Sequence, residues 1–358
     1  MSKKIKIIFG IICLVLIAFI GGLITFYKMS LGPVGTKNEE VVFIIKSGTA
    51  SRNIIDNMYN ADLIKNKYVG YVYLKLHNDI NLQAGTYVLN KGMSLEDIIK
   101  TINNGDVLDD SLAITFVEGK RIIRYAEQIS ETFGYSEDEI LGVWSDKEYL
   151  QELIDKYWFL TDDILNDKLY YALEGYLYPN TYRFEKDATI KEITEKILSS
   201  TEILLNQYKD EIEASKYSIH EILTMASIVE LEGANSDDRR GVAGVFYNRL
   251  ENGWSLGSDV TTYYAVKIDF SDRDLYQYEI EDVNDYNTRP AAMAGKLPVG
   301  PICNASIESI TAALNPEEHD YFFFVADKNK KTYFTKTNAE HVAIIEKLKN
   351  EGLWYVYE

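Results

Sequence analysis

The 358-residue chain has only two cysteines, Cys13 and Cys303. Cys13 lies within a long apolar run near the N-terminus, so we expect no disulfide between the two. The lack of a disulfide does not exclude an exported protein, because a chain of this length can bury large hydrophobic cores. Together with a hydrophobic content of 46%, the length predicts a folded protein with room for two domains.

Histidine is also scarce, and several motifs that mark common classes of enzyme are absent. The four histidines, His77, His220, His319 and His341, show no metal-ligand spacing. The chain has no Walker A loop, no C-x-x-C pair and no S-x-x-K of penicillin-binding enzymes. These absences favour acid–base chemistry by carboxyl groups, which needs neither a metal nor another cofactor, and we expect none.

Positive charge is the minority, with 37 lysines and arginines against 55 acidic residues and a net charge of −18. A protein that binds nucleic acid needs clustered lysine and arginine to neutralise phosphates. We therefore expect no nucleic-acid partner.

The N-terminus carries a run of 21 residues without charge, Ile7 to Tyr27, preceded by Lys3, Lys4 and Lys6. As a helix this run is about 31 Å long, close to the thickness of a membrane's hydrocarbon core. A cleaved signal peptide is the competing interpretation, but its apolar region is about 7–15 residues long and ends in a small-x-small site. The preceding lysines predict residues 1–6 as a cytoplasmic tail, 7–27 as a transmembrane anchor and 28–40 as a linker. We expect a single-pass protein of the cell membrane, with everything after the span outside the cytoplasm.

After the linker, a strand, a glycine turn and a helix follow one another three times, over residues 41–58, 85–102 and 113–129. Ser94 is a plausible N-cap for the helix of the second copy. The first two copies predict one small α/β unit at residues 41–108, followed by a larger unit at 109–358. From about Tyr135 to Tyr208 the pattern is mainly helical.

The segment Glu174 to Phe184, EGYLYPNTYRF, interrupts that helical pattern, because its proline, glycine and aromatic residues are incompatible with a helix. Two interpretations remain open. The segment is either a buried aromatic loop that fixes two helices or a wall that contacts a glycan through its tyrosines.

A helix with clear start and stop signals carries the most unusual carboxyl group, Glu230. Ser218 and Glu221 predict a capping box at its start, and Gly233 predicts its end at the C′ position. At 100° per residue Glu230 shares a face with small and apolar side chains, whereas Glu232 points almost opposite.

The surroundings of Glu230 have two interpretations. A mostly apolar cavity raises the pKa of a carboxyl group and suits it to general-acid catalysis at neutral pH. Alternatively, Glu230 forms a salt bridge with Arg239, Arg240 or Arg249. The helix pattern alone does not decide between them.

Five ordered motifs resemble the endolytic murein transglycosylase family (MltG, YceG-like), and the resemblance covers nearly the whole chain. They are ASIVELE at 226–232, VAGVFYNRL at 242–250, LGSDVTTYY at 256–264, DYNTRPAAMAGKLPVGPICN at 285–304, and the closing strands and helix from Tyr321 to His341. EGYLYPNTY resembles a further motif of the family. Val260, Arg289, Lys296 and Val299 depart from the family pattern in the predicted substrate loops.

The resemblance implies an α+β fold with an N-terminal transmembrane helix, a LysM-like α/β subdomain at 41–108 and a mixed α/β catalytic domain at 109–358. It also implies cleavage of the bond between N-acetylmuramic acid and N-acetylglucosamine in peptidoglycan glycan strands, leaving 1,6-anhydro ends. Such an enzyme terminates glycan strands during cell-wall assembly, with peptidoglycan synthases as candidate partners. Glu230 matches the family's catalytic acid. The other signature polar positions, candidates for the substrate cleft or its support, are Asn248, Arg249, Asp259, Thr261, Tyr264, Tyr286, Asn287 and Thr288.

Two rival functions remain at this point. The first is a muramidase that uses water and a second carboxylate, for which Asp259 is the most plausible residue. The second is a membrane-anchored scaffold that binds glycans without cutting them.

Overall fold

The computed structural model describes residues 3–105, 111–233, 235 and 237–354, and the chain divides into two compact units, 1–110 and 111–358. The unit boundary predicted after residue 108 lies outside the described residues.

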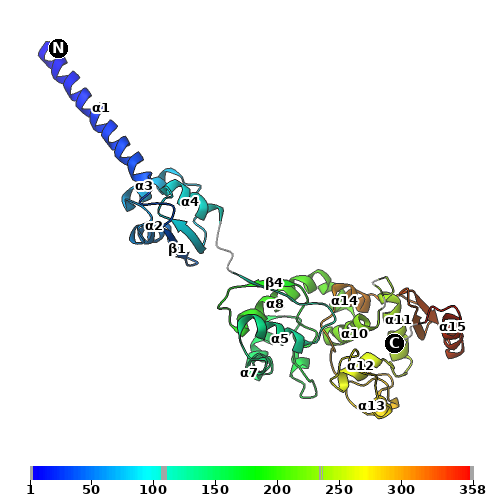
Figure 1. Cartoon of the computed structure of the whole chain (residues 1–358). Helices are drawn as coiled ribbons and strands as arrows, with labels where there is room; N and C mark the ends of the chain where they lie inside the picture. The colour runs from blue at the N-terminus through cyan, green and yellow to red at the C-terminus, as the bar shows by residue number, and fades with distance from the viewer. Residues whose placement is uncertain (1–2, 106–110, 234, 236, 355–358) are drawn as a thin grey trace. The chain divides into compact units, whose positions relative to one another are not determined.

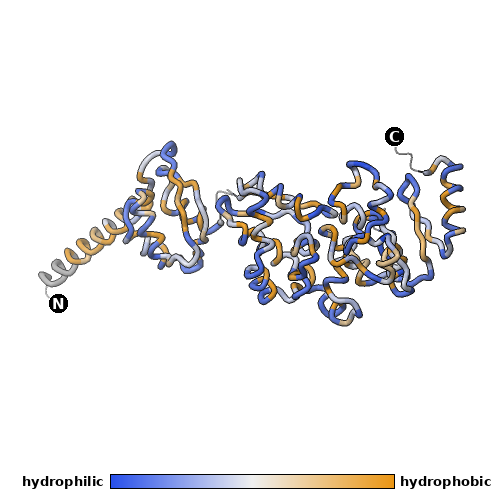
Figure 2. Tube along the Cα trace, turned by 90° about the horizontal axis from the view of Figure 1, so that it is seen from below, coloured by the Kyte–Doolittle hydropathy of each residue, from blue (hydrophilic) through white to orange (hydrophobic). Residues whose placement is uncertain are grey.

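The first unit begins with a long apolar helix and continues as a small α/β fold (Figure 1). Helix α1 has a 21-residue stretch, Ile11–Leu31, with a mean hydropathy of 2.3, long and apolar enough to cross a membrane. Figure 2 shows the hydrophobic residues continuing along it. The elements of this unit are α1 (Lys3–Leu31), β1 (Glu40–Ile45), α2 (Ser51–Asn60), α3 (Lys67–Leu76), β2 (Gly85–Asn90) and α4 (Leu95–Asn104).

The two strands of this unit pair antiparallel, with Val42 opposite Val88. One face of this sheet, including Phe43 and Tyr87, is buried against the helices. Ser94 forms the predicted N-cap of α4, in a capping box with Asp97. The two predicted strand–turn–helix copies are therefore confirmed in this unit.

The second unit is mostly helical and contains only small sheets. Strand β3 (Leu112–Thr115) pairs with β4 (Thr181–Phe184), and β5 (Phe323–Ala326) pairs with β6 (Thr332–Thr335). The longer helices among its described residues are α5 (Ile122–Phe133), α7 (Lys147–Lys156), α8 (Ile190–Leu205), α10 (Ile219–Glu232), α11 (Arg239–Glu251), α14 (Ile307–Leu314) and α15 (Asn338–Asn350). The shorter helices are α6 (Glu137–Val143), α9 (Lys209–Ala214), α12 (Asp259–Ala265) and α13 (Gln277–Glu281). The predicted α+β class and the N-terminal apolar helix are confirmed.

The aromatic segment interrupts the mainly helical stretch from Tyr135 to Tyr208, as predicted. Helices α6, α7 and α8 lie there, but the aromatic segment between them contains β4, which the sequence analysis missed. In β4, Tyr182 and Phe184 alternate with exposed residues, as expected for a strand with one buried face. So many aromatic residues surround this short alternation that it did not stand out.

Helix α10 is the buried centre of the second unit. Ten of its 14 residues are buried, and it packs against α14, α11 and α12 (Figure 1). Ser218 and Glu221 form the predicted capping box at its start. Apart from Glu221 in the first turn, only the C-terminal turn, which carries Glu230 and Glu232, leaves the buried core.

Candidate active site

Glu230 lies in the last turn of α10, where the starts of α11 and α14 meet it. The Oε1 atom of Glu230 accepts a hydrogen bond from Arg239 Nη2 at 3.0 Å. Its Oε2 atom accepts from the Ser306 backbone N–H at 2.9 Å and from the Ser306 hydroxyl. The side chain is 8% exposed, so the carboxylate is held on both oxygens and remains just reachable from outside.

Ser306 and Arg239 also bind each other. Arg239 Nη1 donates to Ser306 Oγ at 2.9 Å, and Ser306 caps α14 by accepting from the Ser309 N–H. Because the Ser306 oxygen already accepts from these two donors, its own proton is available to Glu230. The three side chains form a closed polar cluster that joins α10, α11 and α14.

Gly233 gives Arg239 the space to reach Glu230. It ends α10 as predicted, but its φ of −68° is not the left-handed conformation of a typical C′ glycine. A Cβ at this position would lie 2.9 Å from Arg239 Cγ and 2.9 Å from the Val229 carbonyl oxygen. Close approach, and not a left-handed backbone, is therefore what requires glycine here.

The structure decides between the two interpretations of the Glu230 surroundings. Glu230 forms an ion pair with Arg239, so the expectation of a mostly apolar cavity is wrong. Arg240 and Arg249 instead donate to the carbonyl oxygens of Asn315 and Phe322. Hydrogen-bond donors therefore occupy both carboxylate oxygens of Glu230. General-acid catalysis requires one of these donors to move away so that the oxygen can carry a proton.

Glu232 contacts a different element, as its place on the opposite face of α10 predicts. Its Oε1 atom accepts from Ser258 Oγ at 2.6 Å, at the start of α12. Burial raises the pKa of the Glu232 carboxyl group, with the Ser258 hydrogen bond opposing this effect. Glu232 therefore braces α12 and does not share the contacts of Glu230.

Two further carboxylates lie near this end of α10. Asp259 is half-exposed and forms an ion pair with Arg289 at 2.5 Å, so it is not among the contacts of Glu230. Glu308, on the first turn of α14, lies 4.0 Å from Arg239 Nη1 and is more than half exposed. Glu230 and Glu308 thus share one guanidinium group. The sequence analysis missed Glu308 because nothing in the spacing relates it to Glu230.

Five of the predicted substrate-binding residues are buried in internal hydrogen bonds. Thr261 and Thr288 bond to each other at 2.8 Å, and the Asn287 side chain bonds to Thr262 and to three backbone carbonyls. The Tyr264 hydroxyl donates to Glu174, and that of Tyr286 accepts from the Tyr170 N–H. These hydrogen bonds hold the loops on either side of α12 in place.

Asn248 and Arg249 have similar bracing contacts at the end of α11. The Asn248 amide donates to the carbonyl oxygens of His319 and Tyr321 at 2.8 and 2.9 Å. Arg249 donates to the carbonyl oxygens of Phe322 and Leu256 and lies over the Phe323 ring. Both residues attach α11 to the segment that leads into β5.

A loop from the other side of the unit also borders Glu230. Gly119 follows β3 with a φ of +72°, and a Cβ there would lie 3.7 Å from Glu230 Cγ. This loop is fixed by Glu174, which accepts from the Ile122 N–H at 2.8 Å and from the Tyr264 hydroxyl at 3.1 Å. Burial raises the pKa of Glu174 to about 8. The sequence analysis did not single out Glu174, although it begins the aromatic segment.

The aromatic segment itself is largely buried, which favours the interpretation as an internal loop. Tyr176 and Leu177 are inaccessible, Tyr182 is nearly so, and Tyr178 is half-buried. The Tyr176 hydroxyl bonds to His220 Nδ1 at 2.7 Å, which ties the segment to α10.

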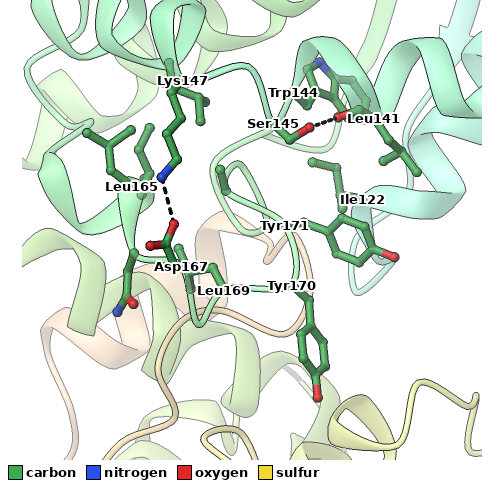
Figure 3. Close-up of a pocket in the computed structure, with 14 residues that line it drawn as sticks. Ile122, Leu141, Trp144, Ser145, Lys147, Leu165, Asp167, Leu169, Tyr170 and Tyr171 are labelled. Carbon is green, nitrogen blue, oxygen red and sulfur yellow. Dashed lines mark hydrogen bonds and ion pairs between the residues drawn. The ribbon is translucent and has the colours of Figure 1, made fainter.

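A separate cavity of about 190 Å³ lies between the α6–α7 region and the loop that precedes the aromatic segment. Figure 3 shows Tyr170 and Tyr171 on one side and the exposed Lys147–Asp167 ion pair on another. None of the side chains that contact Glu230 lines this cavity.

The chain also contains a G-x-S-x-G pattern, Gly253 to Gly257, which in hydrolases marks a nucleophilic serine. Here it follows helix α11 and not a strand, and Ser255 Oγ donates to the Pro290 carbonyl oxygen at 3.1 Å. This context does not match a nucleophile elbow. Within the described residues no three His, Cys, Asp or Glu side chains are grouped to hold a metal ion.

A model of the YceG-like family matches residues 43–347, so the chain belongs to this family. It is 35% identical over 338 residues to the endolytic murein transglycosylase of Bacillus subtilis (strain 168), covering 93% of this chain and 92% of that protein. It is 28% identical to the Streptococcus pneumoniae (serotype 2, strain D39) protein of the same name, covering 87% of this chain but 59% of the relative. The crystal structure of a YceG-like protein from Listeria monocytogenes aligns with a TM-score of 0.60 and 32% identity, over 86% of this chain and 99% of that chain.

The raised pKa of Glu174 predicts how stability depends on pH. The folded chain keeps the Glu174 proton up to about pH 8, whereas the unfolded chain loses it near pH 4.5. This contribution to stability is present below pH 4.5, falls by about 1.4 kcal/mol per pH unit as the pH rises, and levels off above pH 8. Glu174→Gln, which mimics the protonated group, should therefore reduce the loss of stability between pH 5 and 8.

Chemical unfolding of the detergent-solubilised chain at several pH values measures this effect. The exposed Glu318→Gln serves as the matched control and should keep the wild-type pH dependence. A Glu174→Gln variant with an unchanged pH dependence contradicts the assignment of a protonated Glu174.

Proposed function

We propose that this chain is a membrane-anchored endolytic lytic transglycosylase of peptidoglycan, with Glu230 as its acid–base residue. The observation that carries the proposal is the position of Glu230. It is the one carboxylate on the outer end of the buried α10 that is held by donors on both oxygens, in a chain 35% identical to a protein of that activity. The bond cut is the one between N-acetylmuramic acid and N-acetylglucosamine.

In the first step, protonated Glu230 gives its proton to the glycosidic oxygen as that bond breaks. The sugar then passes through an oxocarbenium-like state, as in other glycosidic cleavages. Because the Ser306 N–H and hydroxyl both bind Oε2, the oxygen that takes part in proton transfer is Oε1, once Arg239 moves from it. Ser306 thus holds the carboxyl group through Oε2 while Oε1 transfers the proton.

In the second step, the resulting Glu230 carboxylate takes a proton from the 6-hydroxyl of the muramyl residue. That oxygen closes onto the anomeric carbon and forms the 1,6-anhydro end, with no water added. This step returns a proton to Glu230, which therefore ends the turnover in the protonated form in which it began. The Arg239 guanidinium stabilises the carboxylate that exists between the two steps. A single carboxyl group serves both steps because the attacking group belongs to the substrate.

A muramidase is the second candidate function, and Glu308 is the observation that favours it. Glu308 shares the Arg239 guanidinium with Glu230, so a second carboxylate is present close to the first. Asp259, the partner expected from sequence, instead pairs with Arg289. A hydrolase would therefore use Glu308 to activate water, and the reaction product separates the two mechanisms.

The cellular setting is part of the proposal. Helix α1 anchors the chain in the cell membrane with the N-terminus in the cytoplasm, because lysines precede the span. The catalytic domain then meets nascent glycan strands on the outer side, where cutting within a strand terminates it. Peptidoglycan synthases are candidate partners in this process.

Glu230→Gln should abolish cleavage while leaving the fold intact. The amide keeps the size and shape of the side chain, but it can neither give its proton to the substrate nor take one back. This loss is typically worth about 10²–10⁴ in rate. Glu232→Gln, two residues away on the opposite face, is the matched control and should retain most activity. Murein zymography with the full chain measures both variants. Wild-type protein that binds murein without cutting it would instead support the glycan-binding scaffold.

The product of cleavage should be a 1,6-anhydro end that lacks one water relative to a reducing end. Digestion of purified murein in H₂¹⁸O, followed by mass spectrometry, should show no ¹⁸O at the new anomeric carbon. Glu308→Gln should leave this product unchanged, with Asp259→Asn as its control. Reducing ends that carry ¹⁸O, lost in Glu308→Gln, would establish the muramidase.

The orientation of the chain is tested by a reporter enzyme that is active only outside the cytoplasm. Fused after the last residue, it should be active in the wild-type chain. Replacing Lys3, Lys4 and Lys6 by glutamate should lower that activity, because the positive charges that hold the N-terminus inside are removed. An inactive reporter on a stable, membrane-bound fusion would contradict the proposed topology.

A further inference from the structure

Helix α3 of the first unit presents an apolar stripe to the outside that no described element covers. Tyr68, Val72 and Leu76 follow one another at intervals of four residues, and they are 67%, 47% and 66% exposed. Residues four apart lie on one face of a helix. A continuous stripe of three large exposed apolar side chains is unusual for a helix on a water-exposed surface.

The rotation of α3 is fixed by packing on its opposite face. Val69, Gly70 and Tyr73 are buried. A Cβ on Gly70 would lie 2.8 Å from Ile55 Cγ2, so the two helices are in close contact there. Packing of the opposite face of α3 therefore holds the apolar stripe on the outside of the unit.

The position of α3 places this stripe next to the proposed membrane span. Helix α3 contacts α1, and Lys65 Nζ donates to the Met29 carbonyl oxygen in the last turn of α1. Tyr27 and Leu31, at the end of the apolar stretch, pack against the core of the same unit. The unit therefore begins where the span ends, at the level of the lipid headgroups.

The charge of α3 also suits a lipid surface. The chain has 55 acidic residues, yet the sequence of α3, KYVGYVYLKL, contains none and has lysines at positions 67 and 75, the first of which pairs with Asp56 of α2. Helices that lie in a membrane interface combine an apolar face with lysines, and tyrosine favours the headgroup region. Anionic lipids attract such basic segments.

We propose that α3 is a second membrane contact, which inserts Tyr68, Val72 and Leu76 into the interface of an anionic lipid bilayer. Together with α1 it holds the first unit against the membrane in one orientation. The inference rests on the proposed membrane anchor α1 and does not depend on the enzymatic activity.

Site-directed spin labelling of the full chain in phosphatidylglycerol–phosphatidylethanolamine vesicles tests the contact. A nitroxide is placed at Val72→Cys in a Cys13→Ala background, with the buried Cys303 retained. Collisions with oxygen, which concentrates in lipid, are compared with collisions with a water-soluble nickel chelate. The oxygen-to-nickel ratio at position 72 should be severalfold higher than at Ile44→Cys, an apolar site on β1 that is 61% exposed against 47% for Val72.

Two further variants make the result decisive. Leu76→Asp should lower the ratio at position 72 to that of position 44, whereas Val42→Asp on β1 should not change it. A label at Ile17, within α1, reports the anchor itself. If position 17 lies in lipid but position 72 is water-exposed, the inference is overturned. If position 17 is water-exposed as well, the anchor proposal fails first.

Discussion

The burial of α10 is the constraint on which the rest of the second unit depends. A helix buried along most of its length can present a charged side chain only at its end, and Glu230 and Glu232 occupy that end. A nearly buried carboxylate is costly unless donors satisfy it. The starts of α11 and α14 supply those donors through Arg239 and Ser306, so the same contacts that make Glu230 tolerable also fix where these helices begin.

A second buried carboxyl group supports the opposite side of the site by different means. No lysine or arginine among the described residues forms an ion pair with Glu174, and burial keeps it protonated to about pH 8. It joins the start of α5 to Tyr264 on α12 and so fixes the loop that places Gly119 beside Glu230. Glu230 is thus paired with a cation, whereas Glu174 is buried in hydrogen bonds to neutral groups. This difference in environment is consistent with proton exchange at Glu230, as proposed above, and with a structural role for Glu174.

Local patterns in the sequence predicted the elements well and the environment of Glu230 poorly. The N-cap at Ser94, the capping box at Ser218, the strand–turn–helix copies and the opposite directions of Glu230 and Glu232 depend on residues within a few positions of each other. The partner Ser306 lies 76 positions from Glu230 in the chain, and no local periodicity relates the two. Strand β4 was missed for a related reason, since its four residues are defined by pairing with β3.

The signature polar residues show how family motifs and geometry carry different information. Motifs marked Thr261, Tyr264, Tyr286, Asn287 and Thr288 as important positions, and their burial explains that importance through the shape of the loops beside α12. In contrast, Glu308 belongs to no motif singled out by the sequence, yet it shares a guanidinium group with Glu230. Whether a carboxylate can take part in the chemistry depends on its access to solvent and its distance from the acid. Glu308 and Asp259 are similarly exposed, but Glu308 shares the Arg239 guanidinium with Glu230, whereas Asp259 pairs with Arg289. A water-activating mechanism would therefore have to use Glu308.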